Sequence, residues 1–390
     1  MEICQGKHSI KEIFLHNNHW QKFSQKHHSL IRSTVFENVD KVFSCKTDKL
    51  GFHQYVCTQC GTSKKVPHTC KSRFCSSCGK VAVDNWVQNS ISKFPDIQYR
   101  HIVFTVPEQL RDLYLMNRKL LLNVFFKLAA NTIISWTKKY KNCTPGIISV
   151  LHTFGKTLEF NPHIHIIASC GGLSSDHSQW IPISFFPEKV LKTRWKYNII
   201  SFIRDSFKNN LISLAPSIKA FKSYPSFNSF LNMLYLRYIW YVHIGKKLTS
   251  LFFTVQYVGR YTKRPVLAET RISSFDGNFV SFWFDDKNLQ KKTFITLSAE
   301  DFIERIIRHI PDKHFRQIRY FGLFANRVRS KLCNIVLKLL NKEFDPPAIT
   351  LSWRMRLIQK NGADPLACSI CNSLMEFSFA VFPIKQGLSP

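Results

Sequence analysis

Two histidines separated by one isoleucine, His163 and His165, stand in the apolar stretch "NPHIHIIASCGG" at residues 161–172. Alternate side chains of an extended strand point to the same face, so both imidazoles share one face while the isoleucines beside them point into a core. His152 lies on the preceding stretch, and a hairpin that turns near Asn161 would place it opposite the histidine pair. Three neutral imidazoles leave coordination positions open, as a catalytic metal requires.

Two classes of enzyme fit three histidines on one face, a zinc hydratase or hydrolase and a phosphodiester nicking enzyme that uses Mg²⁺ or Mn²⁺. The His-x-His-x-Asp-His pattern of metallo-hydrolases is absent, because Ile167 and Ala168 occupy its last two positions. The basic chain favours the phosphodiester reaction. The competing interpretation is a strand whose histidines are hydrogen-bonded polar residues without a metal.

The cysteines form a second group of residues that could bind metal. The pairs "CTQC" and "CSSC" each bring two thiolates close enough to share a tetrahedral Zn²⁺, although a redox dithiol is the alternative for either pair. We expect both pairs to complete one zinc site, made of Cys57, Cys60, Cys75 and Cys78. A second site of mixed type is predicted from the surrounding residues Cys45, His53 and Cys70, with His68 as a further candidate. The glycines that follow the pairs, Gly61 and Gly79, predict turns with positive φ.

The stretch "YVGRYTKRP" places two tyrosines, Tyr257 and Tyr261, four residues apart. On a helix this spacing puts both hydroxyls on one side, one turn apart. A tyrosine hydroxyl attacks phosphorus only as it loses its proton, and neighbouring cations stabilise the charge that develops. The candidate cations are Arg260, Lys263 and Arg264. The alternative interpretation is that the two rings pack in a hydrophobic core.

The net charge of the chain is +30 at pH 7, which far exceeds what solubility requires and indicates a polyanionic partner. Nucleic acid is the first candidate. An anionic membrane surface is the alternative, but no stretch combines a clean apolar face with a lysine-rich one. The sequence contains no apolar leader and no uncharged apolar run of about 18 residues, so we expect a soluble cytoplasmic protein with reduced cysteines.

Hydrophobic periodicity predicts the elements that must position these residues. The first forty residues predict helices, whereas residues 45–78 contain too few aliphatic side chains to fold without metal. Next come a strand over residues 99–107, a long helix over 108–140, and the histidine hairpin. The remaining chain predicts a mostly helical stretch between residues 185 and 250, short strands with a turn at Asp276-Gly277, and a helix whose "SAED" start at Ser298 resembles a capping box.

Five stretches resemble, in their order, the two-tyrosine rolling-circle transposases of bacterial insertion sequences, the insertion-sequence-ninety-one family: the cysteine-rich N-terminal segment, "LHTFGKTLEFNPHIHIIASCGG", "QYVGRYTKRP", "HIPDKHFRQIRYFGLFANR" and "GADPLACSIC". Their catalytic domain is an HUH endonuclease, named for histidine, bulky apolar residue, histidine. The resemblance implies an α+β fold, in which a helical and zinc-ribbon-like N-terminal domain precedes an antiparallel-sheet HUH domain with flanking helices. We expect a zinc-binding DNA-recognition domain at residues 1–90, a catalytic domain at 91–330, and a helical tail at 331–390 that carries Cys368-x-x-Cys371.

The resemblance also implies an activity, which is the nicking of single-stranded DNA and strand transfer through a 5′-phosphotyrosine. Tyr257 and Tyr261 match the nucleophiles, His163 and His165 match the metal ligands, and His152 lies at the spacing of a third histidine in related relaxases. The implied cofactors are Mg²⁺ or Mn²⁺ at the histidines and structural Zn²⁺ at the cysteines. The implied partners are single-stranded element ends and target DNA, in the bacterial cytoplasm at the nucleoid.

Two alternatives to a transposase stay open. A rolling-circle replication initiator or a conjugative relaxase would use the same chemistry for another purpose. A zinc-ribbon protein that binds DNA without cutting it, such as a decayed transposase, would keep the cysteines and the positive charge but need neither the histidines nor the tyrosines.

Overall fold

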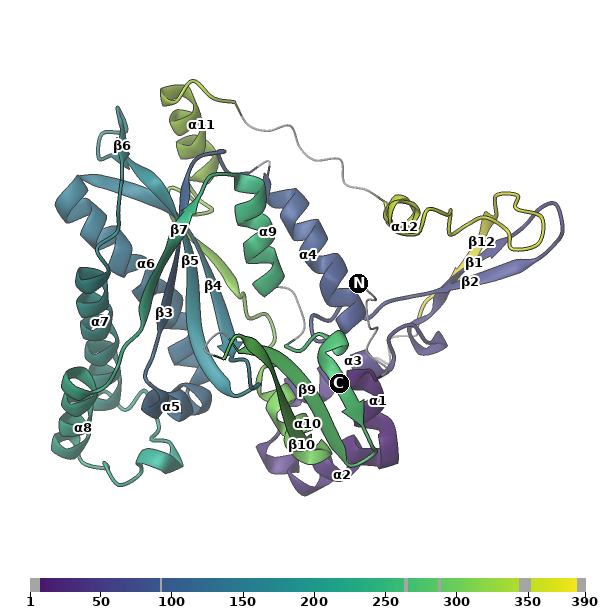
Figure 1. Ribbon diagram of the computed structural model, residues 1–390, viewed down its shortest axis with the longest axis horizontal. Helices are drawn as coiled ribbons and strands as arrows, with labels where there is room; N and C mark the ends of the chain where they lie inside the picture. Colours follow the sequence, from purple (N-terminus) through teal and green to yellow (C-terminus); the bar gives the residue numbers. More distant parts are fainter. Residues whose placement is uncertain (1–7, 92, 263–265, 287–288, 344–351, 384–390) are drawn as a thin grey trace, which may run out of the picture. The chain divides into compact units, whose positions relative to one another are not determined.

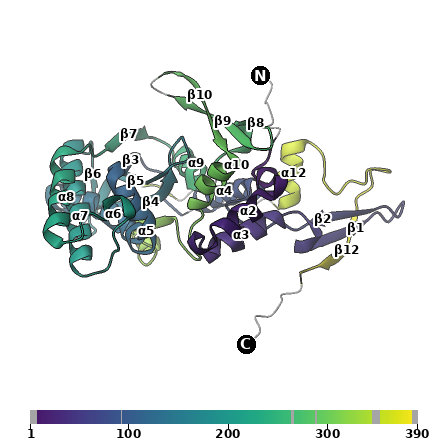
Figure 2. The same ribbon diagram turned by 90° about the horizontal axis from the view of Figure 1, so that it is seen from below.

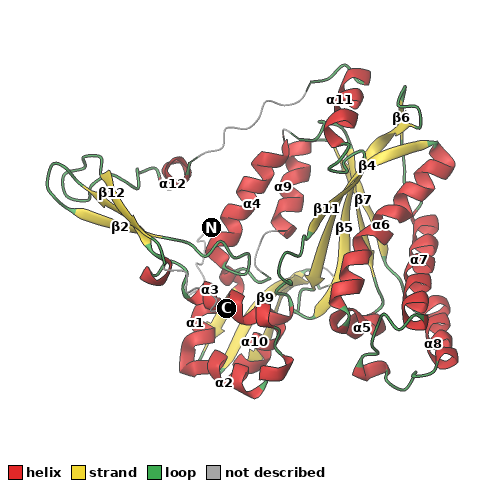
Figure 3. Ribbon diagram, turned by 180° about the vertical axis from the view of Figure 1, so that it is seen from behind, coloured by secondary structure: helices red, strands yellow, loops and turns green. Residues whose placement is uncertain are grey.

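The structure is a computed structural model that describes residues 8–91, 93–262, 266–286, 289–343 and 352–383. The chain divides into two compact units. Unit 1 comprises Met1–Gln88, Lys263–Ile310 and Ala348–Pro390, and unit 2 comprises Asn89–Thr262 and Pro311–Pro347. Both units combine helices with antiparallel sheets, so the predicted α+β class is confirmed (Figure 3).

Unit 2 is built on a six-stranded antiparallel sheet with the order β11-β4-β5-β3-β7, in which β6 pairs with β5 (Figure 1). Its strands are β3 (Tyr99–Thr105), β4 (Cys143–Phe154), β5 (Phe160–Ser174), β6 (Trp180–Pro182), β7 (Val242–Leu248) and β11 (Ile318–Gly322). The strands β4 and β5 form the predicted hairpin. Its turn lies at residues 155–159 and not at Asn161-Pro162, because Leu158 turns the chain with a φ of 64° and β5 already begins at Phe160.

One face of this sheet carries the hydrophobic core of unit 2. Ile164 and Ile166 of β5 are fully buried there, among side chains of the helices behind the sheet. The Trp195 indole donates a 2.7 Å hydrogen bond to the Thr105 carbonyl, which ties a helix to the end of β3. The helices of unit 2 are α5 (Arg111–Met116), α6 (Arg118–Lys141), α7 (Glu188–Lys208), α8 (Tyr224–Arg237), α9 (Leu251–Thr262) and α11 (Arg329–Leu339).

The helices α6 and α9 cover opposite faces of the sheet (Figures 1 and 3). By length and composition α6 could cross a membrane, but its rings at Phe125 and Phe126 are fully buried and the helix packs against β4 and β5. On the other side, α9 packs against β4 and β7. The face of the sheet opposite the hydrophobic core is therefore covered by α9.

Unit 1 contains two small antiparallel sheets and the N-terminal helices. One sheet has the order β12-β1-β2 and is called the ribbon below; the other has the order β10-β9-β8. The strands are β1 (Phe52–Val56), β2 (Ser63–Pro67), β8 (Ile272–Phe275), β9 (Phe279–Asp286), β10 (Lys291–Ser298) and β12 (Glu376–Val381). The helices are α1 (Ile10–Leu15), α2 (His19–Lys26), α3 (Ser33–Phe43), α4 (Ser76–Ile91, whose last residues belong to unit 2), α10 (Ala299–Arg308) and α12 (Trp353–Asn361).

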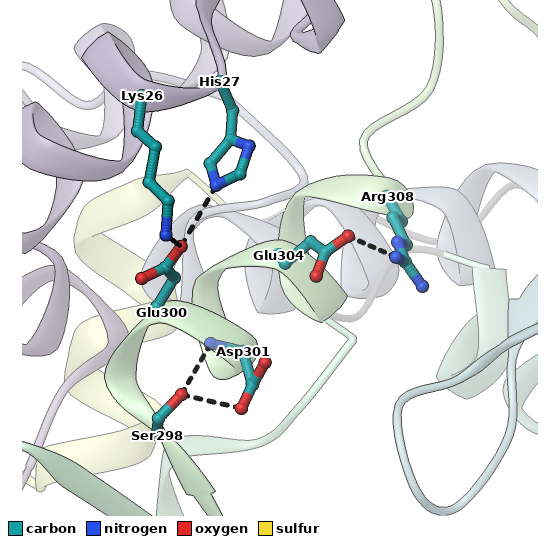
Figure 4. Close-up of polar contacts among 7 residues, drawn as sticks. All are labelled: Lys26, His27, Ser298, Glu300, Asp301, Glu304 and Arg308. Atoms are coloured by element: carbon teal, nitrogen blue, oxygen red, sulfur yellow. Dashed lines mark hydrogen bonds and ion pairs between the residues drawn. The ribbon is translucent and has the colours of Figure 1, made fainter.

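The helix predicted from "SAED" is α10. Its N-cap is Ser298, whose hydroxyl accepts a 3.1 Å hydrogen bond from the Asp301 backbone N–H. In the first turn, the Glu300 carboxylate lies 2.6 Å from the Lys26 ammonium and 3.0 Å from the His27 ring, both on or next to α2 (Figure 4). These contacts tie residues far apart in the sequence into one unit.

Candidate metal centres and the tyrosine helix

The three predicted histidines meet at the end of the β4–β5 hairpin, and we call them the imidazole cluster (His152, His163 and His165). In the strand register His152 lies directly opposite His163, as the sequence predicts. One ring nitrogen from each residue lies within 4.8 Å of the others. The rings sit on the face opposite the core, because the alternating residues Ile164 and Ile166 occupy the core face.

Hydrogen bonds orient two of these rings. The His163 Nδ1 lies 2.7 Å from the Asn161 carbonyl oxygen, which can only accept, so Nδ1 carries the proton and Nε2 keeps a lone pair. The His165 Nδ1 lies 2.8 Å from the Nε2 of His101 on β3, and the two rings stack with an interplanar angle of 6°. Contacts of this kind commonly hold metal-binding imidazoles in place.

Sequence reasoning did not single out His101. The signal was present in "YRHIVFTVP", where His101 alternates with the buried residues Ile102 and Phe104 and so shares a face with Val103. Since Val103 pairs with His165 in the sheet, His101 lies diagonally beside the imidazole cluster. Only the pairing of β3 with β5 makes this visible.

Burial favours the neutral form of two members of the imidazole cluster, His163 and His165. Burial lowers the pKa of His163 below its ordinary value and lowers that of His165 well below it, with the neighbouring His152 adding to the effect at His165. Burial likewise lowers the pKa of His101 to about 4. Neutral imidazoles are metal ligands, whereas protonated ones repel a cation. Three imidazole nitrogens gathered in this way can hold one divalent ion and leave its other positions to oxygen atoms of water or a phosphate.

The predicted nucleophiles lie on α9. Its buried positions, Leu251, Thr254, Val255 and Val258, form one helical stripe. The backbone of Tyr257 and Tyr261 belongs to this helix, one turn apart, as the sequence predicts. The side chains of both tyrosines and of Arg260 lie outside the described residues, as do Lys263 and Arg264 entirely. The helix itself packs against β4, the strand that carries His152.

The cysteines fall into two clusters of four thiols. The first thiol cluster consists of Cys45, Cys70, Cys75 and Cys78, and the ribbon thiol cluster consists of Cys57, Cys60, Cys368 and Cys371. Sulfur–sulfur distances of 3.4–3.7 Å recur in both clusters. Four sulfurs at about 2.3 Å from a tetrahedral Zn²⁺ would lie about 3.8 Å apart, so each cluster fits one zinc ion.

The ribbon thiol cluster is made of two knuckles with the same backbone geometry. The N–H of Gly61 donates to the Cys57 carbonyl at 2.9 Å, and the N–H of Asn372 donates to the Cys368 carbonyl at 3.0 Å. Gly61 and Asn372 both have positive φ, 74° and 60°. Glycine and asparagine are the residues that best tolerate this conformation, so Asn372 was a signal in the sequence that the tail repeats the first knuckle.

Each cluster contains thiols whose pKa is lowered beside thiols whose pKa is raised; in the first thiol cluster, burial raises the pKa of Cys78 to about 11. A hydrogen bond with Cys70 lowers the pKa of Cys75 to about 5. In the ribbon, hydrogen bonds with Ser373 lower the pKa of Cys371 to about 6. The thiolate is the form that binds zinc, so Cys75 and Cys371 are suited to bind the ion first, and the thiols with raised pKa values release their protons as the ion binds.

The structure corrects the sequence-based grouping of the cysteines. Of the four thiols assigned to one site, Cys57 and Cys60 belong to the ribbon, whereas Cys75 and Cys78 join Cys45 and Cys70. The spacing along the chain identifies a knuckle but not its partner, which depends on how distant segments pack.

Two further residues of the predicted zinc region differ from expectation. The ring of His53, expected in a second zinc site, lies 3.0 Å from that of His68, and neither belongs to a thiol cluster. Gly79 lies inside α4 and has no positive φ, because the second knuckle opens directly into a helix.

Comparison with known proteins places these centres in context. Residues 15–106 match the family described as transposase zinc-binding domain, and residues 146–331 match the family described as putative transposase. The transposase for insertion sequence element IS801 of Pseudomonas savastanoi pv. phaseolicola is 31% identical over 384 residues, which cover 97% of this chain and 92% of that protein. The putative transposase y4qJ of Sinorhizobium fredii is 27% identical over 352 residues, 88% of each chain. No solved structure matches the chain.

Proposed function

Because the chain belongs to the insertion-sequence-ninety-one family of transposases, and therefore processes DNA, we propose that it moves its element by rolling-circle transposition. In this proposal it nicks one strand and transfers it through a covalent tyrosine linkage. The nucleophiles are Tyr257 and Tyr261, and the metal ligands are His152, His163 and His165. The substrates are single-stranded element ends and target DNA in the bacterial cytoplasm, at the nucleoid.

The proposed reaction exchanges one phosphodiester for another. The oxygen of one tyrosine attacks the scissile phosphorus and loses its proton as the P–O bond forms. The bond from phosphorus to the 3′ oxygen breaks, and that oxygen takes up a proton and leaves as a 3′-hydroxyl. The 5′ end remains attached as a phosphotyrosine ester, so the energy of the broken bond is conserved and no nucleotide cofactor is required.

The chain's own residues contribute position and charge to this reaction. When bound at the imidazole cluster, Mg²⁺ or Mn²⁺ supplies the polarisation of the scissile phosphate. The hydrogen bonds of His163 and His165 to their neighbours hold the ring nitrogens in place for that ion. Arg260 stands between the two tyrosines in the sequence, Lys263 and Arg264 follow them, and all three attract the backbone of the strand.

One observation carries the proposal. The helix with both tyrosines packs against β4, on the side of the sheet that carries the imidazole cluster and away from the α6 core. A fold in which the two tyrosines were only structural would not require three histidine side chains gathered on the neighbouring strands. In the same proposal, residues 1–90 recognise an element end, residues 91–330 catalyse, and residues 331–390 supply the tail knuckle.

The test is the formation of covalent adducts with labelled single-stranded element ends in the presence of Mn²⁺. We expect Tyr257→Phe with Tyr261→Phe to reduce adducts by roughly 10³-fold or more, because no hydroxyl remains to attack. His163→Ala should also abolish adducts while the zinc content stays unchanged.

The matched control is Tyr197→Phe, which removes a hydroxyl from a tyrosine that is exposed on α7. It should form adducts like the unaltered protein. Adducts that persist in the double tyrosine variant would refute the assignment of the nucleophiles. Salt-sensitive DNA binding without adducts in the unaltered protein would support the non-catalytic alternative.

A further inference from the structure

The β8-β9-β10 sheet of unit 1 has one covered face and one outer face (Figure 2). On the covered face, Phe282 of β9 is fully buried, and the centroid of its ring lies 6.3 Å from that of Phe302 on α10. Alternate side chains of a strand point to opposite faces, so Phe279 and Trp283 of β9 lie on the outer face. Helix α10 packs on the covered face against β9 and β10, and its Glu300 carboxylate contacts Lys26 and His27, on or next to α2 (Figure 4).

Aromatic rings gather on the outer face. Trp283 lies directly opposite Phe294 of β10 in the strand register, so their side chains are neighbours on one face. Phe294 is 59% exposed, and Phe279 on the same face is 53% exposed. Large rings placed side by side in solvent mark an interaction surface more often than isolated exposed residues do.

Cations accompany these rings. The Lys292 ammonium lies 4.3 Å from the centroid of the Trp283 ring, and the Arg271 guanidinium carbon lies 5.4 Å from it. Among the described residues of β9 and β10, Asp285 places a carboxylate on this face, opposite Lys292 in the register and toward the end of the strand. We call the rings and the two cations the aromatic platform (Trp283, Phe294, Lys292 and Arg271).

The polar residues of the outer face argue against a hydrophobic protein partner. Beside the rings, the hydroxyls of Ser281 and Thr296 lie 2.7 Å apart across the two strands. A face that alternates hydroxyls, cations and paired rings lacks the continuous apolar area of an obligate protein interface. It does match single-stranded nucleic acid, whose bases stack on aromatic rings while its phosphates attract cations. The net charge of +30 favours the same partner.

We infer that the aromatic platform binds unpaired bases of single-stranded DNA, an inference that rests on the proposed function and adds a second DNA contact to it. One base stacks on Trp283 in place of a cationic side chain that covers the ring, and the next base stacks on Phe294. The displaced cation then contacts a phosphate. Because every base has an aromatic face, the contact is independent of sequence.

The test compares two fluorescent oligonucleotides of equal length, one of thymidines and one of abasic sites, with the full-length protein at fixed salt. Both oligonucleotides carry the same phosphates, but only the thymidine strand has bases that can stack on the rings of the aromatic platform. We expect the unaltered protein to bind the thymidine strand roughly tenfold or more tightly than the abasic strand. In Trp283→Ala with Phe294→Ala, the two oligonucleotides should bind with nearly equal affinity.

Three variants control this comparison. Phe185→Ala removes another exposed ring with a lysine over it, but outside the platform, and should keep the preference for bases. Phe294→Ala alone truncates an exposed side chain and should reduce the preference even if the double variant fails to fold. Lys292→Gln should keep the preference for the thymidine strand. It should lower the magnitude of the slope of log affinity against log salt by about one, the value expected for the loss of one phosphate contact.

A double variant that still prefers the thymidine strand would overturn the inference. So would a loss of affinity for both strands alike, or a dimer of the unaltered protein that dissociates in the double variant, since a second copy would then cover the face. Failure of the proposed function is seen separately, because it removes covalent adducts while the preference for bases remains.

Discussion

The thiol clusters and the imidazole cluster all contain pairs of metal-binding side chains that are close in sequence, but they differ in how many coordination positions they fill. Each thiol cluster supplies four sulfurs and so fills a tetrahedral ion completely. The imidazole cluster supplies three nitrogens and leaves positions for other ligands. The first arrangement can stabilise a fold but offers no place for a substrate, whereas the second can bind one.

The surroundings of the clusters differ in the same sense. The ribbon thiol cluster joins two knuckles that lie far apart in the sequence, in a segment with few core residues. The imidazole cluster lies on a sheet whose core is complete without it, because the residues that alternate with the histidines fill that core. We therefore expect the loss of thiols to affect folding and the loss of imidazoles to affect chemistry.

The largest effect should follow from Cys368→Ser. Structural zinc contributes apparent binding free energies on the order of 10 kcal/mol in small zinc domains, so the loss of one ligand should release the ribbon ion and unfold β1, β2 and β12. Metal analysis should fall from two zinc ions per chain to one, and limited proteolysis should cut the ribbon first.

The control for this experiment is Cys333→Ser, which alters a buried thiol on α11 that belongs to neither cluster. It should keep two zinc ions. If Cys368→Ser also kept two zinc ions, the tail would not contribute a zinc ligand. The contrast between the four-ligand thiol clusters and the three-ligand imidazole cluster would then not hold for the ribbon.

An intermediate effect should follow from His101→Ala. Because the His101 ring contacts His165 and fixes its orientation, we expect Mn²⁺ affinity to fall by roughly 10–100-fold, as when outer partners of metal-binding histidines are removed. Titration of zinc-loaded protein, followed by the electron paramagnetic resonance of free Mn²⁺, measures this directly.

His101→Gln should recover much of the Mn²⁺ affinity, since its amide can replace the ring as a hydrogen-bonding partner. His177→Ala, in an exposed turn between β5 and β6, should leave the affinity unchanged. Equal affinities in all three variants would show that His101 does not position the metal ligand.

The smallest effect concerns pH. Burial lowers the pKa of His101 to about 4, whereas the unfolded chain has the ordinary value of 6.5. Between these values the unfolded chain binds more protons than the folded protein, so the free energy of unfolding must fall as pH falls. For His101 alone the loss is about 1 kcal/mol between pH 6.5 and 5.5.

Urea unfolding without added Mn²⁺, at pH 6.5 and 5.5, measures this loss. His101→Gln should reduce the difference between the free energies of unfolding at the two pH values. The difference that remains has the same sign, because the pKa values of His163 and His165 are also lowered. An unchanged difference in His101→Gln would contradict the burial of a neutral ring at this position.

Local patterns were sufficient to predict much of the fold and part of the site. The alternation in "NPHIHIIASCGG" predicted which residues face the core, and the spacing to His152 predicted its position opposite His163. The spacing of Tyr257 and Tyr261 fits the helix α9 on which they lie, and the serine of "SAED" predicted the cap of α10. These features depend on residues close in sequence, where backbone geometry alone decides the neighbours.

Only the tertiary structure decided which distant segments meet. It joined the tail knuckle of Cys368 and Cys371 to that of Cys57 and Cys60, brought His101 beside His165, and placed Lys263–Ile310 in unit 1 with the N-terminal helices. The physical reason is the same in each case. A Cys-x-x-Cys pair or a strand histidine has the same local geometry with any partner, so the partner is selected by strand pairing and core packing along the whole chain.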